Sequence, residues 1–317
     1  MADIYSNTTK TGSLSSDTTA FEQLAYFALR SQPMFEMVAD VKSTNQSHPG
    51  AAVQFNIYND IAQATSALTE GEEITPVALS DSTVTVTLAE YGNAVVTSAK
   101  LRGTSFLNVD ADAANIVGYN MANSIDKIVQ NVLVGGTNVI YGGDATATGE
   151  LAAGDTITAS LIRKTVAALR GDSAPTFAGG HYIGFIHPDV SFDLREDTAV
   201  TDIIQYQIRQ DPSAVRQGSI GMFGGVDFIE TSRIDHGTND GASNVDGYKT
   251  MICGKQALAK AHSRTAGFGE NPSVEMGPVT DILRRMQPIG WYHLVGYSRF
   301  REASLRRIET SSSIGAN

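Results

Sequence analysis

A glycine-rich run between Gly218 and Gly225 is the first place where this sequence could perform chemistry, because closely spaced glycines can cradle a phosphate. The run reads Gly-Ser-Ile-Gly-Met-Phe-Gly-Gly, which matches neither the GxGxxG spacing nor the GxxxxGK spacing of a P-loop. No lysine follows closely to neutralise a phosphate. We therefore predict a turn that requires positive φ angles, and no nucleotide site.

Three polar residues, His181, His187 and Asp189, are close enough in sequence to suggest metal ligands. His187-Pro188-Asp189 is, however, typical of a helix start with proline in the first turn. Neither an HExxH motif nor a Cys/His cluster accompanies these residues. Serine, histidine and aspartate all occur, but no GxSxG elbow indicates a nucleophilic triad. The sequence thus predicts no metal, no cofactor and no catalytic residue.

The single cysteine and a run of glutamates complete the candidates. Cys253 follows Met251 and Ile252, so we expect a small buried hydrophobe and no nucleophile. Glu70, Glu72 and Glu73 could share a Ca²⁺ ion, but they lack the spaced Asp/Asn ligands of a calcium loop. A solvated or partner-facing acidic tip is the better interpretation.

Composition excludes several functional classes. The 317 residues are 42% hydrophobic and 18% charged, as in globular proteins, and carry a formal charge of −11. Diffuse attraction to nucleic acid or to an anionic membrane is therefore not expected. One cysteine, no secretory signal and no apolar run of about 18 residues predict a soluble protein that is made in the cytoplasm.

Charge is unevenly distributed along the chain. Residues 1–160 hold 6 Lys+Arg against 17 Asp+Glu, whereas six arginines follow residue 280. This asymmetry suggests head-to-tail contact between copies, although solvated faces would give the same counts. On this hypothesis the candidate inter-subunit contacts join the acidic tip to arginines near the C-terminus. The candidates are Glu70, Glu72, Glu73, Arg284, Arg285, Arg299 and Arg301.

The elements that would position these residues follow from periodicity. After a polar N-terminus, Phe21, Leu24, Ala25 and Ala28 lie on one face of an expected helix. Alternating runs at 53–57 and 84–88 predict two strands joined by a polar excursion of roughly twenty residues. Such a length is typical of a loop that contacts a partner, with a disordered surface insertion as the alternative.

Further along, the spacing predicts a long helix over 110–134, acidic at its start and ended by Gly135-Gly136. A second helix is expected from Ser160, as its cap, to Gly171. Strands are expected at 181–186 and 226–230, and a long extended stretch over 290–308. The mixed order, without a regular βαβ rhythm, indicates an α+β fold.

Three stretches resemble one protein family: Ile186-His-Pro-Asp-Val-Ser-Phe-Asp-Leu-Arg-Glu-Asp197, the segment 218–234, and Gly290-Trp-Tyr-His-Leu-Val-Gly-Tyr-Ser-Arg-Phe-Arg301. They look like the major capsid proteins of tailed bacteriophages, whose fold is the Johnson (HK-ninety-seven-like) fold. The order of expected elements matches that family over nearly the whole chain. The resemblance implies an N-terminal arm (1–49), an extended two-stranded loop (50–100), a peripheral domain with a spine helix (101–155), an axial domain (156–276), and a C-terminal return to the peripheral domain (277–317).

The resemblance also implies a function. Copies of the chain would form pentamers and hexamers of an icosahedral shell that encloses double-stranded DNA without reading its sequence. The chain would be a virion protein made in the host bacterial cytoplasm, with a portal and, in some systems, scaffolding or decoration proteins as partners. No membrane contact is implied. Two alternatives remain open: an encapsulin-type shell of a cellular compartment, and an enzyme with an unrecognised site.

Overall fold

The structure of this chain is a computed structural model. It describes residues 33–41, 52–71, 73–105, 108–197, 221–262, 272–279 and 282–314. The expected N-terminal arm up to residue 32, with its helix around Phe21, lies outside the described residues, as does Glu72.

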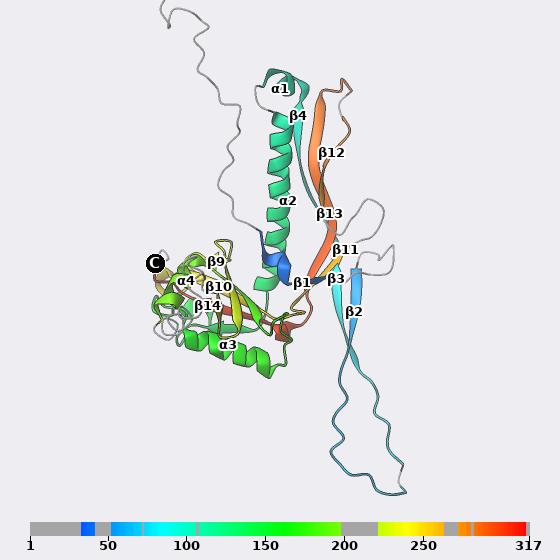
Figure 1. The fold of residues 1–317 in the computed structure, drawn as a ribbon, viewed down its shortest axis with the longest axis vertical. Helices are drawn as coiled ribbons and strands as arrows, with labels where there is room; N and C mark the ends of the chain where they lie inside the picture. The colour runs from blue at the N-terminus through cyan, green and yellow to red at the C-terminus, as the bar shows by residue number, and fades with distance from the viewer. Residues whose placement is uncertain are drawn as a thin grey trace, which may run out of the picture.

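The molecule is elongated, with one lobe to the side of a long axis (Figure 1). Helix α2 (Val109–Val134) and long strands form the upper part of this axis, and a two-stranded hairpin continues it below. The lobe lies beside the lower end of α2. The upper end of the axis and the tip of the hairpin therefore both lie far from the lobe.

Helix α2 follows the sequence prediction closely. It begins one residue earlier than expected, carries Asp110 and Asp112 in its first turn, and ends at Gly135. These acids favour the positive end of the helix dipole. At about 1.5 Å per residue the 26 residues span roughly 39 Å. The short helix α1 (Ala99–Thr104) precedes it, capped by the Ser98 hydroxyl, which accepts from the Leu101 N–H at 3.2 Å.

A five-stranded sheet runs along α2. Its order is β1-β11-β13-β12, with β4 also pairing with β13. The long β13 and β4 are antiparallel, from Met286 opposite Ser98 to Val295 opposite Ala89. The bounds are β1 Ala39–Val41, β4 Ala89–Ser98, β11 Leu258–His262, β12 Ser273–Met276 and β13 Met286–Arg299.

A seven-stranded sheet forms the lobe, in the order β5-β14-β10-β6-β8-β7 with β9 beside β10. Its strands are β5 Val139–Tyr141, β6 Tyr182–Ile186, β7 Met222–Phe223, β8 Val226–Glu230, β9 His236–Gly237, β10 Gly247–Cys253 and β14 Leu305–Thr310. Helices α3 (Ala159–Gly171) and α4 (Pro188–Glu196) pack on it. Short 3-10 helices are η2 Phe35–Val38, η3 Thr148–Glu150, η4 Ala242–Asn244 and η5 Glu302–Ser304.

Two buried clusters lie on opposite faces of this sheet, as the alternation in β10 shows. Tyr248 and Ile252 belong to the cluster that contains α3 and α4. Met251 and Cys253 belong to the other cluster, which contains the end of α2 and η2. Side chains two apart share a face because the strand period is two. Cys253 is fully buried, and burial raises the pKa of its thiol to about 12, so the interpretation as a buried hydrophobe is confirmed.

The hairpin consists of β2 (Ala52–Tyr58) and β3 (Asp81–Thr87), the two strands that alternation predicted. They pair antiparallel, with Ala52 opposite Thr87 and Tyr58 opposite Asp81. Val53 and Val86 are buried against Ala259 and Ala261 of β11. The base of the hairpin is therefore fixed to the five-stranded sheet.

Each sheet combines strands from more than one expected segment. β5 of segment 101–155 and β14 of segment 277–317 pair in the lobe with strands of segment 156–276. β11 and β12 of segment 156–276 pair with β13 of segment 277–317 in the five-stranded sheet. The extended stretch 290–308 is broken by η5, so that β13 and β14 enter different sheets. Alternation of apolar and polar residues shows which face of a strand is exposed, but it does not show which other strands pair with it.

One helix cap also differs. The cap of α3 is Thr158, whose hydroxyl accepts from the Leu161 N–H at 3.3 Å, and not Ser160 as expected. Either residue type can cap a helix, and the extended backbone of residue 158 decides the position.

Candidate assembly surfaces

Two of the three residues that suggested a metal site have side-chain partners. His187 caps α4, its Nδ1 accepting from the Asp189 N–H at 3.3 Å, and the helix start predicted at His187-Pro188-Asp189 is confirmed. The His181 carbonyl accepts from the Phe177 N–H at 3.0 Å, whereas its buried Nδ1 has no hydrogen-bond partner among the described residues. The Asp189 carboxylate accepts from the Tyr248 hydroxyl at 2.9 Å. Among the described residues, no group of three or more His, Cys, Asp or Glu side chains is placed to hold a metal ion.

In the glycine-rich run, Gly224 and Gly225 form the turn between β7 and β8, and Gly221 precedes β7. Gly221, Gly224 and Gly225 have φ values of 62°, 61° and 90°, which confirms the predicted positive-φ turn for the described part of the run. Residues 218–220 lie outside the described residues.

Within the described ranges, no helix is long and apolar enough to cross a membrane.

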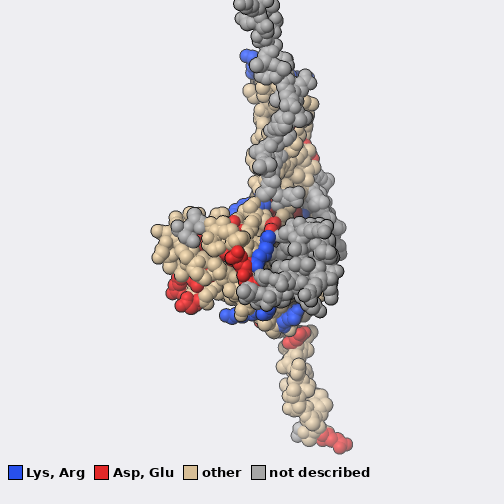
Figure 2. Space-filling model, turned by 60° about the vertical axis from the view of Figure 1, so that its left-hand side comes forward, with Lys and Arg blue, Asp and Glu red and all other residues tan. Residues whose placement is uncertain are grey.

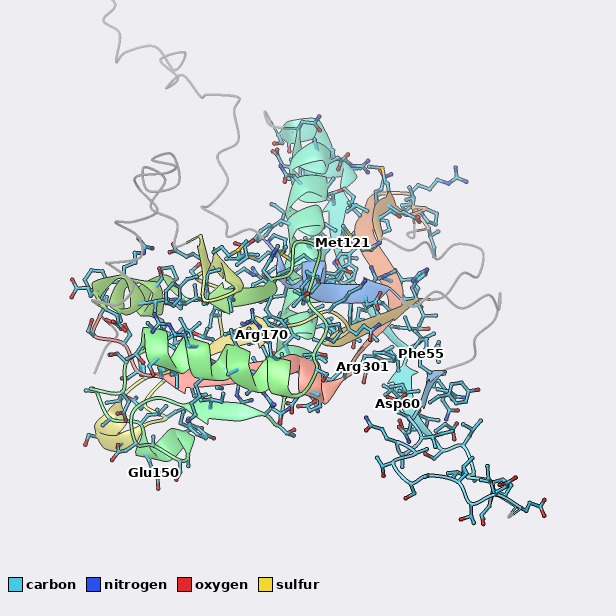
Figure 3. The ribbon with its side chains drawn as sticks, turned by 60° about the horizontal axis from the view of Figure 1, so that its bottom comes forward. Phe55, Asp60, Met121, Glu150, Arg170 and Arg301 are labelled. Atoms are coloured by element: carbon cyan, nitrogen blue, oxygen red, sulfur yellow. The ribbon has the colours of Figure 1, made fainter. Side chains whose placement is uncertain are left out.

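The loop beyond the hairpin, residues 59–80, exposes every side chain that the structure describes there. Its paired part ends with the Asn59 N–H, which donates to the Ser80 carbonyl at 3.0 Å. Figure 3 shows Asp60 where pairing ends and Phe55 nearer the body, packed edge-on against Phe300 with centroids 6.2 Å apart. We call residues 59–80 the projecting loop. No other described part of the chain buries it.

Apolar side chains line this loop despite its polar composition. Leu68 is 74% exposed, and the other large exposed apolar residues from the end of β2 through the loop are Tyr58, Ile61, Ile74, Val77 and Leu79. Six large exposed apolar side chains between residues 58 and 79 indicate an interaction site, because soluble proteins seldom gather such residues on their surface otherwise. These residues were not predicted from the sequence. The sequence does contain large apolar residues in this segment, but they recur with neither the period of a strand nor that of a helix.

A second exposed apolar group lies at the opposite end of the molecule, around α1 and the adjoining ends of β4, β12 and β13. We call it the distal patch. Ile282 is 98% exposed, and the other members are Val95, Val96, Leu101, Met276, Val279, Leu283 and Met286. Lys100, Arg284 and Arg285 are exposed beside it. The distal patch is thus apolar with a basic border.

The structure separates the charged residues that sequence reasoning selected. Glu70 and Glu73 lie exposed at the tip of the projecting loop, where Figure 2 shows acidic side chains. Gly71 turns the chain there with a φ of 87°. Arg284 and Arg285 lie at the distal patch, at the other end of the fold. Since the two groups do not meet within one chain, any contact between them would require another copy.

The two remaining arginines differ from each other. Arg299 donates from Nε to Glu302 at 2.8 Å and from Nη1 to the Val132 carbonyl at 3.2 Å. It is therefore engaged within its own chain. Hydrogen bonds and the Arg299 charge hold the pKa of Glu302 below its usual value, although burial alone would raise it. Arg301 is exposed near the hairpin base (Figure 3).

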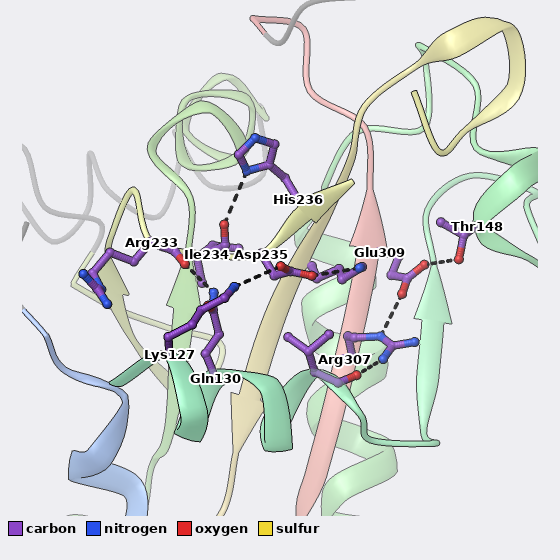
Figure 4. A network of polar contacts seen from close by, with 11 residues as sticks. Lys127, Gln130, Thr148, Arg233, Ile234, Asp235, His236, Arg307 and Glu309 are labelled. Atoms are coloured by element: carbon purple, nitrogen blue, oxygen red, sulfur yellow. Dashed lines mark hydrogen bonds and ion pairs between the residues drawn. The ribbon is translucent and has the colours of Figure 1, made fainter. Parts of the chain in front are cut away.

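A polar network holds the lobe to α2 (Figure 4). The Asp235 carboxylate accepts from Lys249 at 2.9 Å and from Lys127 of α2 at 3.3 Å. Burial alone would raise the pKa of Asp235, but the two lysines lower it. The nearly fully buried Glu309 pairs with Arg307 at 2.7 Å and accepts from the Thr148 hydroxyl at 2.6 Å.

Asp126 of α2 anchors the start of the described chain. Its Oδ1 accepts from the Met34 N–H at 2.8 Å and the Phe35 N–H at 2.7 Å. Its Oδ2 accepts from Arg233 Nε at 2.7 Å, and the aspartate is only 2% exposed. Residues of α2, the lobe and the N-terminal segment therefore meet at one carboxylate, which fixes the lobe relative to the long axis.

The fold is elongated, and both of its far ends expose apolar side chains. These features are typical of a subunit that assembles with other copies. The sequence matches the model of the phage capsid protein family over residues 10–314. The chain therefore belongs to the phage capsid protein family. It is a structural component of the virion that assembles with copies of itself, and the expectation that it is not an enzyme is confirmed by this membership.

Solved structures agree in fold. The chain is similar to the cyanophage Pam1 capsid subunit at 16% identity, with a TM-score of 0.76, over 99% of this chain and 100% of that one. The capsid protein of Ralstonia phage GP4 matches at 16% identity, with a TM-score of 0.74, over 96% and 98% of the chains. The acid-stable capsid of Helicobacter pylori bacteriophage KHP30 matches at 11% identity, with a TM-score of 0.72, over 96% and 98%. A search of the curated proteins found no match. The predicted capsid fold is confirmed.

Proposed function

We propose that this chain is the major capsid protein of a tailed phage, and that pentamers and hexamers of it build an icosahedral head around double-stranded DNA. The observation that carries this proposal is the pair of exposed apolar surfaces at opposite ends of one elongated subunit. Two different surfaces that complement each other make a heterologous contact, and such contacts close into rings when the rotation allows. The net charge of −11 leaves packaged DNA mobile, because the shell repels the duplex.

Sheet pairing supports a revised domain assignment. We assign the seven-stranded lobe, including β5 and β14, to the axial domain that meets its copies around the symmetry axes. Helix α2 and the five-stranded sheet, including β11 and β12, form the peripheral domain. Residues 52–87 form the extended loop. A portal and, in some systems, scaffolding or decoration proteins are the further partners that this function requires.

The projecting loop of one copy is proposed to contact the distal patch of a neighbour. The acidic tip with Glu70, Glu72 and Glu73 suits the basic border with Arg284 and Arg285. An exposed ion pair contributes only about 0.2–1 kcal/mol, whereas burying one large apolar side chain contributes about 1.5–3 kcal/mol. Apolar contact should therefore supply most of the affinity, and the charges should set the orientation.

Electron microscopy and sedimentation of purified particles test this function. We expect wild-type protein to form closed shells. A variant with Leu68→Ser, Ile74→Ser and Val77→Ser should stay unassembled at all salt concentrations, while its unfolding curve matches wild type. Changing Glu70, Glu72 and Glu73 together to lysine should block assembly at low salt, where charge effects are largest, and Glu72→Lys alone should not.

Ile116→Ser, an exposed apolar position on α2 outside both surfaces, is the matched control and should assemble normally. A wild-type chain that remains monomeric under every assembly condition would refute the function. If the triple serine variant assembles like wild type, only the proposed contact of the projecting loop is refuted, and the proposed function is not.

A further inference from the structure

An open groove beside α2 is not used by the contacts described so far. Its volume is about 480 Å³, which has room for a few large side chains. Its apolar lining consists mainly of Pro33, Met34, Met37, Met121, Ile125 and Pro272. Met121, labelled on α2 in Figure 3, lies near the segment that begins the described chain. Methionine side chains adapt readily to an apolar partner.

The groove is held in a defined shape. Met34 and Phe35 are bound through their N–H groups to Asp126, and Phe35 is fully buried against Phe185 with ring centroids 4.9 Å apart. Ile125 forms a buried part of the lining on the α2 side. Met37, by contrast, remains 54% exposed. A fixed apolar groove with an uncovered wall is suited to receive a further apolar segment.

The position of Pro33 points to the occupant. Pro33 lines the groove and is the first described residue, so residues 1–32 enter the fold there. Their most apolar stretch places Phe21, Leu24, Ala25 and Ala28 on one helical face. Only four residues separate Ala28 from Pro33, and the chain can span at most about 17 Å over that distance. The apolar face is therefore confined to the neighbourhood of the groove.

The charged residues of the groove are already paired within the chain. Glu36 and Asp126 also line the groove, but Glu36 pairs with Lys260 at 2.7 Å and Asp126 with Arg233 at 2.7 Å. Apolar contact, and not charge, therefore selects the occupant. We propose that the groove between η2 and α2 seats residues 17–32 of the same chain, with Phe21 and Leu24 directed toward Met121 and Ile125. The seat fixes where the N-terminal arm leaves the subunit.

Crosslinking tests this seat directly. With cysteines at Leu24→Cys and Met121→Cys, a short bis-maleimide should join the two positions within one chain, so that the product is a monomer carrying the mass of one linker with both thiols consumed. Cys253 is buried, and burial raises the pKa of its thiol, so it should not react. The pairs Gln23→Cys with Met121→Cys, and Leu24→Cys with Ile116→Cys, are controls and should crosslink at least tenfold less. A product of dimer mass would overturn the proposal in favour of another copy's arm.

Proteolysis of the wild-type chain gives an independent measurement. Trypsin should cut after Arg30 at least tenfold more slowly than after Lys10, because a seated segment must open before cleavage. Met121→Glu should remove this protection, and Ile116→Glu should not. Equal cleavage at Arg30 and Lys10 in the wild type, without an intrachain crosslink, would overturn the proposal. Both measurements use the unassembled chain, so they do not depend on the capsid contacts proposed above.

Discussion

Replacing Asp126 with alanine tests how the subunit holds its lobe against the long axis. The carboxylate is 2% exposed and accepts three hydrogen bonds, from Met34, Phe35 and Arg233. Arg233 also donates to the Asn123 carbonyl at 3.3 Å, and its side chain is only 11% exposed. The substitution leaves this guanidinium without its carboxylate and two N–H groups without an acceptor.

The size of the effect follows from these contacts. Removing one partner of a buried ion pair costs about 3–5 kcal/mol, because the remaining charge stays buried without compensation. Each backbone donor left unsatisfied costs about 1–3 kcal/mol, although water entering the site offsets part of this. We expect Asp126→Ala to lower the free energy of unfolding by about 3–5 kcal/mol. That is a large part of the roughly 5–15 kcal/mol that stabilises a typical domain.

Urea unfolding of the unassembled chain at pH 7 measures this loss. Asp112→Ala, on the same helix but near its exposed start, is the matched control and should cost less than about 1 kcal/mol. Arg233→Met combined with Asp126→Ala should cost less than the sum of the single changes, since both charges are then absent. A loss below about 1 kcal/mol for Asp126→Ala would refute the role of this carboxylate as an anchor.

Two further predictions concern pH and packing. Burial, followed by the Lys260 charge, lowers the pKa of His293 from 6.5 to about 4, so the unfolded chain binds more protons between these values. The free energy of unfolding should therefore keep its full value above about pH 6.5 and fall by on the order of 3 kcal/mol toward pH 4. Urea unfolding measured across this range should show a smaller decrease for His293→Gln than for wild type. Parallel pH curves for the two proteins would contradict this. In Gly296→Ala the new Cβ would lie 2.3 Å from the Thr87 carbonyl oxygen, so we expect thermal unfolding to show a loss of about 1–3 kcal/mol. Gly103→Ala in α1, where no atom lies within 4 Å, should be neutral or slightly stabilising, and equal stability of Gly296→Ala and wild type would refute the close packing.

The positions of individual helices and strands could be predicted from the sequence because each depends on residues that are close together in the chain. The strands at 52–58 and 81–87 and the helix at 109–134 appear close to their predicted positions. In each case apolar residues recur with the period of the element, and this period depends only on backbone geometry. The start of α4 at His187-Pro188-Asp189 was also predicted from a local signal, since proline is tolerated in a helix mainly in its first turn. The family resemblance rested on the order of these elements.

The pairing of strands was not accessible in the same way. β13 and β14 are separated by only five residues, yet they belong to different sheets. β14 lies between β5 and β10, which come from distant parts of the chain. Strand neighbours are selected by long-range packing, and one sequence without its fold carries no periodic signal for them.

The candidate contact residues show the same division. Composition and charge alone determined that the chain has an acidic tip, a basic C-terminal region and no recognisable catalytic motif. Only the tertiary structure decided that Arg284 stays exposed at the distal patch while Arg299 binds Glu302 of its own chain. It also decided that Asp126 meets Phe35, 91 residues earlier in the sequence. A side chain's charge is set by its chemistry, but whether that charge is free for a neighbour depends on which distant groups the fold brings within hydrogen-bond distance.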